Sequence, residues 1–276
     1  MAGDEERLPN LRDAVAVPEA RVREFREKGH TLLRGLASRA EVEAYRPAIV
    51  ETALRQRWEK RPLEERDTYG RAFLQMLNLW VHDERVSAFV TAERFARVAA
   101  ELMGVNGVRL YHDQALFKEP GGGATPWHQD HFYWPLDTEQ TVTLWMPLVD
   151  IPEQVGSMTF ASGSHRLGDL GDHAIGDESQ SVFEELVRER GLARDTHGAM
   201  SAGDATFHAG WTLHSSGPNP TSSLREVMTV IYYPEGTRVC REITPGRRLD
   251  LKVWLRGCEP GGLAAGPLNP LLFERS

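Results

Sequence analysis

The chain has 276 residues, of which 41% are hydrophobic and 26% charged, a composition typical of globular proteins rather than of disordered or fibrous ones. Its net charge is −8, and the lysines and arginines are scattered, which argues against a nucleic-acid-binding surface. All-β barrels and sandwiches of this length form single domains, so we expect residues 1–276 to make one domain.

The cysteines and the start of the chain indicate the compartment. Cys240 and Cys258 can form neither a disulfide framework nor a C-x-x-C pair, and we expect both to pack as reduced thiols. The first residues, MAGDEERLPNL, lack the apolar segment of a signal peptide, and no run of about 18 apolar residues follows. These features predict a cytoplasmic protein without membrane attachment, and nothing in the sequence indicates an obligate protein partner.

The first part of the chain, to about residue 105, is predicted to be mainly helical. Residues 18–28 have an apolar face and end at a glycine, which is typical of a helix, and residues 30–36 suit a short strand. Ser38 and Glu41 resemble a capping box that opens a second helix. A third helix is expected over residues 93–103, where apolar residues recur at helical spacing.

From about residue 107 the pattern changes to short strands. Runs rich in β-branched and aromatic residues, separated by Gly, Pro, Asn and Asp, cover residues 108–118, 141–148, 157–160, 204–207 and 226–233. Several short strands with such turns predict a sandwich or jelly roll, here over about residues 106–256. The predicted fold class is therefore mainly β with flanking helices.

Residues 166–200 interrupt the strand series. This segment is long, polar and partly helical, at about residues 182–190. An insertion of this kind in a β domain is either a lid-like segment over a binding site or a tolerated surface loop.

The sequence Trp-His128-Gln129-Asp130 carries the first chemical signal. In a strand, residues i and i+2 project from one face, so His128 and Asp130 would point into one cavity while Gln129 faces away. One histidine and one carboxylate make two thirds of the facial triad that holds Fe(II) and leaves positions open. The third ligand must be a distant histidine, and His208 and His214 share strand parity as candidates.

Three other histidines are assigned elsewhere. His82 begins an H-x-E sequence without a partner motif and is expected on the surface. His131 would point away from Asp130 in a regular strand. His165 follows a turn and is expected to cap the next segment.

Further motifs extend the signal. They are Phe117-Lys118-x-Pro120, His128-x-Asp130, Gly156–Phe160 with Gly163–His165, and His214-x-Ser216-Gly-Pro-Asn219 followed by Arg225. In this order and spacing, the chain resembles the phytanoyl-CoA dioxygenase family of iron- and 2-oxoglutarate-dependent oxygenases. The resemblance covers about residues 110–235, with an N-terminal extension before it.

The resemblance implies a fold and a set of cofactors. The fold is a double-stranded β-helix, which is a jelly-roll, cupin-like core. The cofactors are Fe(II), 2-oxoglutarate as cosubstrate and O2, with ascorbate as an accessory reductant. His214 rather than His208 is the implied third ligand, because the Ser-Gly-Pro-Asn turn follows it directly.

The resemblance also assigns the cosubstrate site. Arg225 would bind the far carboxylate of 2-oxoglutarate, since a guanidinium offers a planar fork that matches a carboxylate. Ser216 would supply a hydroxyl, and Trp145 would line the pocket. In isolation, however, Arg225 could form an ordinary salt bridge and Trp145 could fill the core.

Three further residues are weaker candidates for the same pocket. Gln114 and Lys118 have the strand parity that would let them face the cavity. Thr125 is carried over by position alone.

The intact carboxylate at Asp130 favours hydroxylation over halogenation, and desaturation, epoxidation and ring rearrangement remain open. Phe132, Trp134 and Trp211 flank the triad and would form either a substrate wall or core packing. The substrate is expected to be a small molecule, with a secondary metabolite favoured because no basic cluster suggests a coenzyme A pocket.

Two alternatives follow from the same residues. One is a cupin-like module that binds a metal or ligand without catalysis, against which the cosubstrate anchor Arg225 argues. The other is a cupin metalloenzyme that does not use 2-oxoglutarate.

Overall fold

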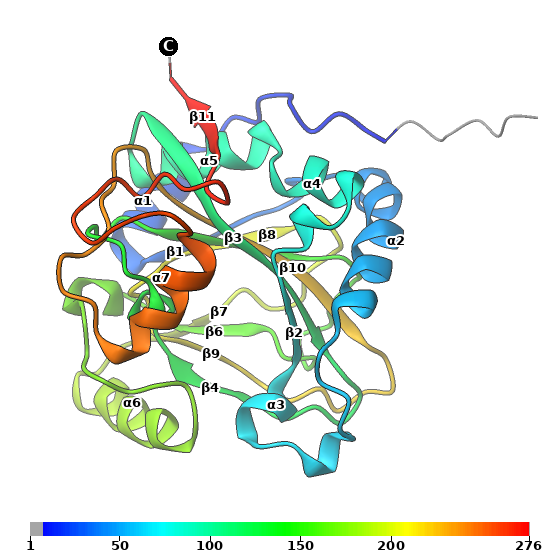
Figure 1. Cartoon of the computed structure of the whole chain (residues 1–276). Helices are drawn as coiled ribbons and strands as arrows, with labels where there is room; N and C mark the ends of the chain where they lie inside the picture. Colours follow the sequence, from blue (N-terminus) through cyan, green and yellow to red (C-terminus); the bar gives the residue numbers. More distant parts are fainter. Residues whose placement is uncertain (1–7, 276) are drawn as a thin grey trace, which may run out of the picture.

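The computed structural model describes residues 8–275, which form two antiparallel β-sheets flanked by helices (Figure 1). The larger sheet has the strand order β1–β8–β5–β10–β3–β11, with β2 paired to β3, and the smaller sheet has the order β4–β9–β6–β7. Strands that follow one another in the sequence are thus often not neighbours in a sheet, and the chain crosses repeatedly between the two sheets, as in a jelly roll. The predicted double-stranded β-helix is confirmed.

The bounds of the elements follow. The larger sheet contains β1 (His30–Leu33), β2 (Leu74–Leu77), β3 (Gly107–Lys118), β5 (Val142–Pro147), β8 (Ala205–Ala209), β10 (Arg225–Pro234) and β11 (Leu271–Glu274). The smaller sheet contains β4 (Thr125–His128), β6 (Met158–Ala161), β7 (Arg194–Thr196) and β9 (His214–Ser216). The helices are α1 (Glu19–Lys28), α2 (Arg39–Gln56), α3 (Thr68–Ala72), α4 (Glu84–Val90), α5 (Glu93–Met103), α6 (Asp177–Glu189) and α7 (Arg248–Trp254).

Strand β10 shows how the two faces of the larger sheet are used. Met228, Val230 and Tyr232 belong to the main apolar core, which they share with helices α1, α2, α4 and α5. The intervening Val227 belongs instead to the core between the sheets, and Thr229 lines a cavity there. Because side chains alternate along a strand, one strand supports the helical layer and the site at once.

The helical layer follows the sequence closely. Helix α5 matches the predicted residues 93–103, and its apolar stripe is fully buried. At the start of α2, Ser38 Oγ accepts from Glu41 N at 3.2 Å, and Glu41 Oε2 accepts from Ser38 N at 2.7 Å, which is the predicted capping box. Helix α1 ends at Gly29, whose φ of 81° is a left-handed conformation that glycine adopts without strain.

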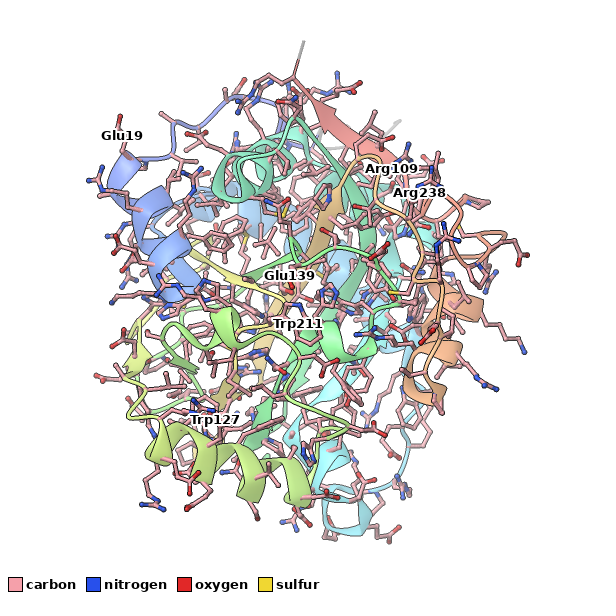
Figure 2. All side chains as sticks on the ribbon, turned by 90° about the vertical axis from the view of Figure 1, so that its left-hand side faces the viewer. Glu19, Arg109, Trp127, Glu139, Trp211 and Arg238 are labelled. Atoms are coloured by element: carbon pink, nitrogen blue, oxygen red, sulfur yellow. The ribbon has the colours of Figure 1, made fainter. Side chains whose placement is uncertain are left out.

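The inserted segment 166–200 is largely part of the fold. Helix α6 packs Phe183 and Val187 against Trp127 of β4, and Trp127 Nε1 donates to Glu184 at 2.9 Å. Trp127 lies beside this helix in Figure 2. Strand β7 then pairs with β6 at the edge of the smaller sheet. Because α6 and β7 are packed into the fold, only the stretch between Leu167 and α6 remains a candidate for the predicted lid.

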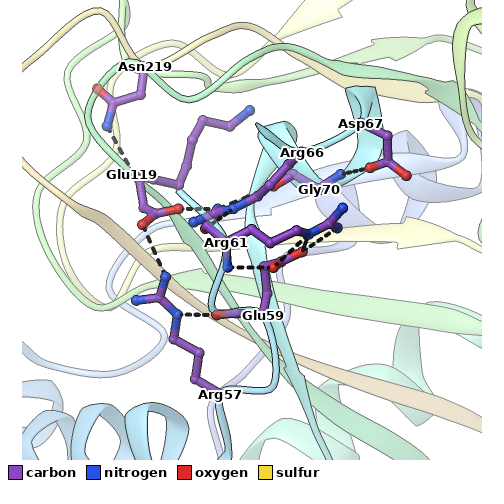
Figure 3. A network of polar contacts seen from close by, with 9 residues as sticks. Arg57, Glu59, Arg61, Arg66, Asp67, Gly70, Glu119 and Asn219 are labelled. Carbon is purple, nitrogen blue, oxygen red and sulfur yellow. Dashed lines mark hydrogen bonds and ion pairs between the residues drawn. The ribbon is translucent and has the colours of Figure 1, made fainter. Parts of the chain in front are cut away.

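The connection between α2 and β2 is held by a charged network (Figure 3). Arg66 forms an ion pair with Glu119, and Arg57 lies 3.7 Å from the same carboxylate. Asp67 accepts a hydrogen bond from Gly70 N at 2.7 Å and caps α3. The network fixes α3 beside the end of β3, where its side chains reach the cavity between the sheets.

Within residues 8–275, no helix combines the length and the apolar character needed to cross a bilayer. Residues 1–7, which include most of the N-terminal sequence judged to lack a signal peptide, lie outside the described residues.

Candidate active site

Two strands of the smaller sheet bring the predicted triad together. In the β4–β9 pair, His128 is the direct partner of His214. Asp130 Oδ1 lies 3.6 Å from His128 Nε2 and 3.7 Å from His214 Nε2. The three ligand atoms fall within 4.8 Å of one another, so one ion can contact all three.

Hydrogen bonds fix the orientation of both histidines. His128 Nδ1 donates to Pro126 O at 2.8 Å, and His214 Nδ1 donates to Thr212 O at 2.9 Å. Each ring therefore carries its proton on Nδ1 and directs the Nε2 lone pair at the carboxylate. This is the arrangement in which a carbonyl acceptor prepares a neutral imidazole to bind a metal.

Asp130 is held through its other oxygen. Its Oδ2 accepts from Thr143 Oγ1 at 3.0 Å and from His208 Nε2 at 3.1 Å. Thr143 and His208 are direct partners in the β5–β8 pair, so their side chains emerge together from one face. Burial opposes ionisation of Asp130, whereas the hydrogen bond from His208 favours the carboxylate, and the pKa of Asp130 is held well below its ordinary value.

The structure corrects the path of the chain through this motif. Strand β4 ends at His128, and a 3-10 helix begins at Asp130, so the two ligands converge across a strand end rather than along a regular strand. Gln129 nevertheless faces away, because its Nε2 donates to Trp211 O at 2.7 Å. His131 also faces away, with Nδ1 2.8 Å from the hydroxyl of Thr141.

Arg225 lies on the wall of the same cavity. Arg225 is 3% exposed, and one of its nitrogens donates to Gly156 O at 2.7 Å. Its guanidinium carbon lies 5.4 Å from the centroid of the Trp145 ring. Its Nε has no hydrogen-bond partner among the described residues, and burial lowers the pKa of Arg225 to about 9. A buried guanidinium without a carboxylate partner is costly unless an anionic ligand completes it.

Most of the other predicted cosubstrate residues line this cavity too. Ser216 Oγ donates to Thr125 Oγ1 at 2.9 Å, and both side chains are buried. Gln114 also lines the cavity, and its Oε1 accepts a hydrogen bond from Gln75 Nε2 at 2.7 Å. Lys118 is not part of the cavity wall, because its Nζ turns to Gly123 O at 2.5 Å.

The cavity continues beyond the triad, with a volume of about 330 Å³. Of the predicted aromatic wall, Trp134 lines the cavity, but Phe132 and Trp211 do not. For Phe132 the reason is the 3-10 helix that begins at Asp130, which breaks strand alternation and turns Tyr133 to the cavity instead. Trp211 packs on His131, with ring centroids 4.5 Å apart, behind the site.

Several lining residues were not predicted as site residues. They come from α3, β2, the neighbouring positions of β3, the segment before α6, and α7: Tyr69, Phe73, Gln75, Leu77, His112, Leu116, Ile175, Leu249, Asp250 and Trp254. The strand parity of Gln114 was a signal for His112, which shares it. The residues on α3 and α7 carry no motif, and only the tertiary fold brings them here.

The family model for phytanoyl-CoA dioxygenase (PhyH) matches residues 25–227, well over half of the chain. The chain belongs to the phytanoyl-CoA dioxygenase family. The sequence motifs alone suggested that the helical part was an extension before the family region. The match begins within α1, however, so the family model includes the helical part from residue 25 onward.

A curated relative in Stutzerimonas stutzeri is described as a probable alpha-ketoglutarate-dependent hypophosphite dioxygenase. It is 28% identical over 159 residues, which cover 56% of this chain and 55% of the relative. The alignment therefore spans about half the length of this curated relative.

Solved structures give similar matches over nearly the whole chain. The non-heme alpha-ketoglutarate-dependent carbocyclase SnoK from nogalamycin biosynthesis is 26% identical with a TM-score of 0.75, covering 92% of this chain and 96% of its own. The epimerase SnoN, solved with Fe3+, alpha-ketoglutarate and nogalamycin RO, is 25% identical with a TM-score of 0.74, covering 92% and 98%. These descriptions agree with the iron and 2-oxoglutarate expected from the sequence.

Proposed function

We propose that this member of the PhyH family is an Fe(II)- and 2-oxoglutarate-dependent dioxygenase that hydroxylates an unactivated C–H bond of a small molecule. The observation that carries the proposal is one cavity that brings together His128, His214 and Asp130 with a buried arginine, Arg225, that pairs with no carboxylate within residues 8–275. A binding module without catalysis would have no use for that combination.

His128, Asp130 and His214 would hold the iron. Two neutral imidazoles and one carboxylate form the donor set of the facial triad, which leaves positions for other ligands. The hydrogen bonds on both Nδ1 atoms and on Asp130 Oδ2 support this role, because they leave one atom of each residue facing the common point.

Arg225 would bind the distal carboxylate of 2-oxoglutarate. Its guanidinium is held by Gly156 O on one side and has an unused N–H, so it can receive a carboxylate without rearrangement. Ser216 would turn its hydroxyl hydrogen from Thr125 to the cosubstrate, Thr125 would donate its own hydroxyl hydrogen nearby, and Trp145 would cover the cosubstrate. Gln114 would contact the cosubstrate or the substrate. Lys118 would hold Thr125 in place, because its Nζ donates to the Thr125 hydroxyl at 3.3 Å.

The iron and cosubstrate, when bound, supply the activation of O2 and the oxidation of the C–H bond, with succinate and CO2 as products of the cosubstrate. This chain's own residues orient the substrate and exclude bulk water. The wall of Phe73, Tyr133, Trp134 and Trp254 suits a small molecule with a large apolar surface, which supports a secondary metabolite.

The outcome of the oxidation can differ from hydroxylation. SnoK and SnoN are described as a carbocyclase and an epimerase, so ring formation or epimerisation is a second candidate on the same site. Mass spectrometry of the product separates these outcomes. Hydroxylation adds one oxygen atom, ring closure removes two hydrogens, and epimerisation leaves the composition unchanged.

The first test is a titration of 2-oxoglutarate into anaerobic protein reconstituted with Fe(II). We expect the weak visible charge-transfer band of a chelated iron complex. His214→Ala should abolish the band, and Arg225→Ala should raise the 2-oxoglutarate concentration needed for it. Arg238→Ala, an exposed arginine away from the cavity, is the matched control and should behave as the parent.

Stoichiometric iron binding without a band would contradict the cosubstrate role and favour a cupin metalloenzyme. Failure to bind either iron or 2-oxoglutarate would favour a non-catalytic binding module.

A further inference from the structure

Helix α7 forms a wall of the cavity that the iron and cosubstrate do not need. Leu249, Asp250 and Trp254 of this helix line the cavity. Asp250 and Asp130 are the two carboxylates in the described lining, and Asp130 belongs to the metal site. Asp250 is therefore the acidic group on the side of the cavity left for substrate.

The Asp250 carboxylate has two neutral hydrogen-bond partners, Tyr111 and Trp254, and no cationic one within residues 8–275. Its Oδ2 accepts a hydrogen bond from the hydroxyl of Tyr111 at 2.8 Å. Within residues 8–275, no lysine or arginine contributes to its ionisation, and burial raises the pKa of Asp250 to about 6. The group is still mainly ionised at neutral pH, so a carboxylate is kept in a partly buried place without a counter-charge. Such a group is costly unless something bound beside it supplies the opposite charge.

His112 gives a second, independent sign of a polar ligand at this wall. It is 3% exposed, it lines the cavity, and its ring centroid lies 5.2 Å from that of Trp254. Its Nδ1 is buried and finds no hydrogen-bond partner in the described part of the chain. Burial lowers the pKa of His112 to about 4, so the ring is neutral at neutral pH and does not repel a cation.

Aromatic faces complete this end of the cavity. Tyr69, Phe73, Tyr133 and Trp254 all line it, and the lining's one arginine, Arg225, lies at the proposed cosubstrate end. A cation is attracted both to a carboxylate and to the face of an aromatic ring, most strongly that of tryptophan. An anionic substrate group would meet the charge of Asp250 without a cation to offset it.

We infer that the substrate carries a protonated amine, which pairs with Asp250 against the ring of Trp254 while its apolar body extends toward the metal ligands. The inference rests on the proposed function in taking this cavity as the substrate site. It names Asp250 as the residue that selects cationic over neutral and anionic substrates.

Three probes that share one apolar body test this preference: tryptamine, tryptophol and indole-3-propionate, which end in an ammonium, a hydroxyl and a carboxylate. Their binding is measured by isothermal titration calorimetry on the full-length protein, first metal-free and then with Fe(II) and 2-oxoglutarate under anaerobic conditions. We expect tryptamine to bind about tenfold more tightly than tryptophol, as a charged hydrogen-bonded pair predicts, and indole-3-propionate to bind most weakly.

Asp250→Asn keeps the shape and the acceptor for Tyr111 but removes the charge. It should weaken tryptamine about tenfold and leave tryptophol nearly unchanged. Asp137→Asn, at an exposed aspartate outside the cavity, should change neither. Equal binding of tryptamine and tryptophol by the parent, no binding of tryptamine, or an unchanged preference in Asp250→Asn would each overturn the inference.

The failure of this inference is distinct from failure of the proposed function. A charge-transfer band without an amine preference would leave the dioxygenase proposal standing and remove the role of Asp250. An amine preference in metal-free protein without a band would keep the amine site and remove the iron chemistry.

Discussion

The two oxygens of Asp130 have different environments. Oδ1 faces the two histidine Nε2 atoms, whereas Oδ2 is held by Thr143 and His208 from neighbouring strands. Thr143 and His208 are paired positions of β5 and β8 in the larger sheet. The larger sheet therefore sets the orientation of the Asp130 carboxylate, although Asp130 itself follows β4 of the smaller sheet. His208 is thus the support of the carboxylate in this geometry, and His214 completes the triad.

This arrangement predicts that metal affinity depends on Thr143. Thr143→Val removes the hydroxyl with little change in shape and frees the carboxylate to rotate. We expect Mn(II) or Co(II) to bind about tenfold more weakly, which is the usual effect of losing a hydrogen bond to a metal ligand. Calorimetric titration of the metal measures this without any need for turnover.

Thr138→Val, in the loop before β5, is the control and should retain the parent affinity. If Thr143→Val also binds the metal as the parent does, the hydroxyl has no role in orienting Asp130.

At this scale, the sequence could predict residues whose chemistry is written in a local motif. The sequence predicts His128, Asp130, His214 and Arg225 as site residues because their spacing resembles that of the family, and the structure places all four on one cavity. Asp250 could not be found, since it lies in a short helix with no motif and reaches the cavity only through tertiary packing.

Among the elements, α2 begins with a capping box that the sequence predicted. Ser38→Ala removes the hydroxyl that accepts from Glu41 N, which leaves a helix N–H without its partner. We expect the free energy of unfolding to fall by about 1 kcal/mol. Urea denaturation measures the change, with Ser222→Ala as an exposed control outside any helix. A variant as stable as the parent would mean that water replaces the cap without cost.

The stretch between Leu167 and α6 is the part of the insertion that reaches the cavity. Ile175 lines it, and Ile175 N donates to the hydroxyl of Tyr133 at 2.8 Å. We propose that this stretch, rather than all of residues 166–200, is the lid. The remainder is held by α6 against β4 and by the pairing of β7 with β6.

The lid proposal predicts a local effect of Tyr133→Phe. Loss of the hydroxyl removes the acceptor for Ile175 N, so amide hydrogen exchange between residues 169 and 176 should become faster. Exchange in α6 should stay at the parent rate, because its packing on Trp127 is untouched. Mass spectrometry of exchanged peptides distinguishes the two. Equal acceleration in α6 would show that the insertion moves as one unit.

Element prediction succeeded where a helical period, or an apolar run between turn residues, marks the segment, and it failed where neither is present. Helix α5 and strand β3 were predicted nearly to the residue, since each has a sustained period. Strand β2 has only four residues and is defined by pairing with β3, and α7 is a single short helix after a proline turn. Neither has a period long enough to identify.

Across the whole molecule, the two sheets are joined by a partly buried polar network on the far side of Phe160 from the triad. His30 of β1 lies 3.1 Å from His197 through Nδ1 and 2.7 Å from the hydroxyl of Ser162 through Nε2. Ser162 in turn donates to Asp195 of β7 at 2.7 Å. The network therefore links an edge of the larger sheet to the end of the smaller one.

This network makes stability depend on pH through His30. Burial and the charge of His197 lower the pKa of His30 from 6.5 to about 3. Below pH 6.5 the unfolded chain takes up a proton at this residue and the folded chain does not. The contribution of His30 to stability is thus complete above pH 6.5 and is lost as the pH falls toward 3, by at most about 1.4 kcal/mol per pH unit.

His30→Gln isolates this contribution, because glutamine can hydrogen-bond but does not titrate. The parent should be more stable at pH 7, and its advantage should shrink by about 2 kcal/mol between pH 7 and pH 5, since other groups cancel in the difference. Urea denaturation in the presence of a chelator measures both proteins. His82→Gln, at an exposed histidine, should give a curve parallel to that of the parent. A difference between parent and His30→Gln that stays constant over this range would mean that His30 accepts its proton in the folded protein as readily as in the unfolded chain, and that the junction of the two sheets tolerates a charge.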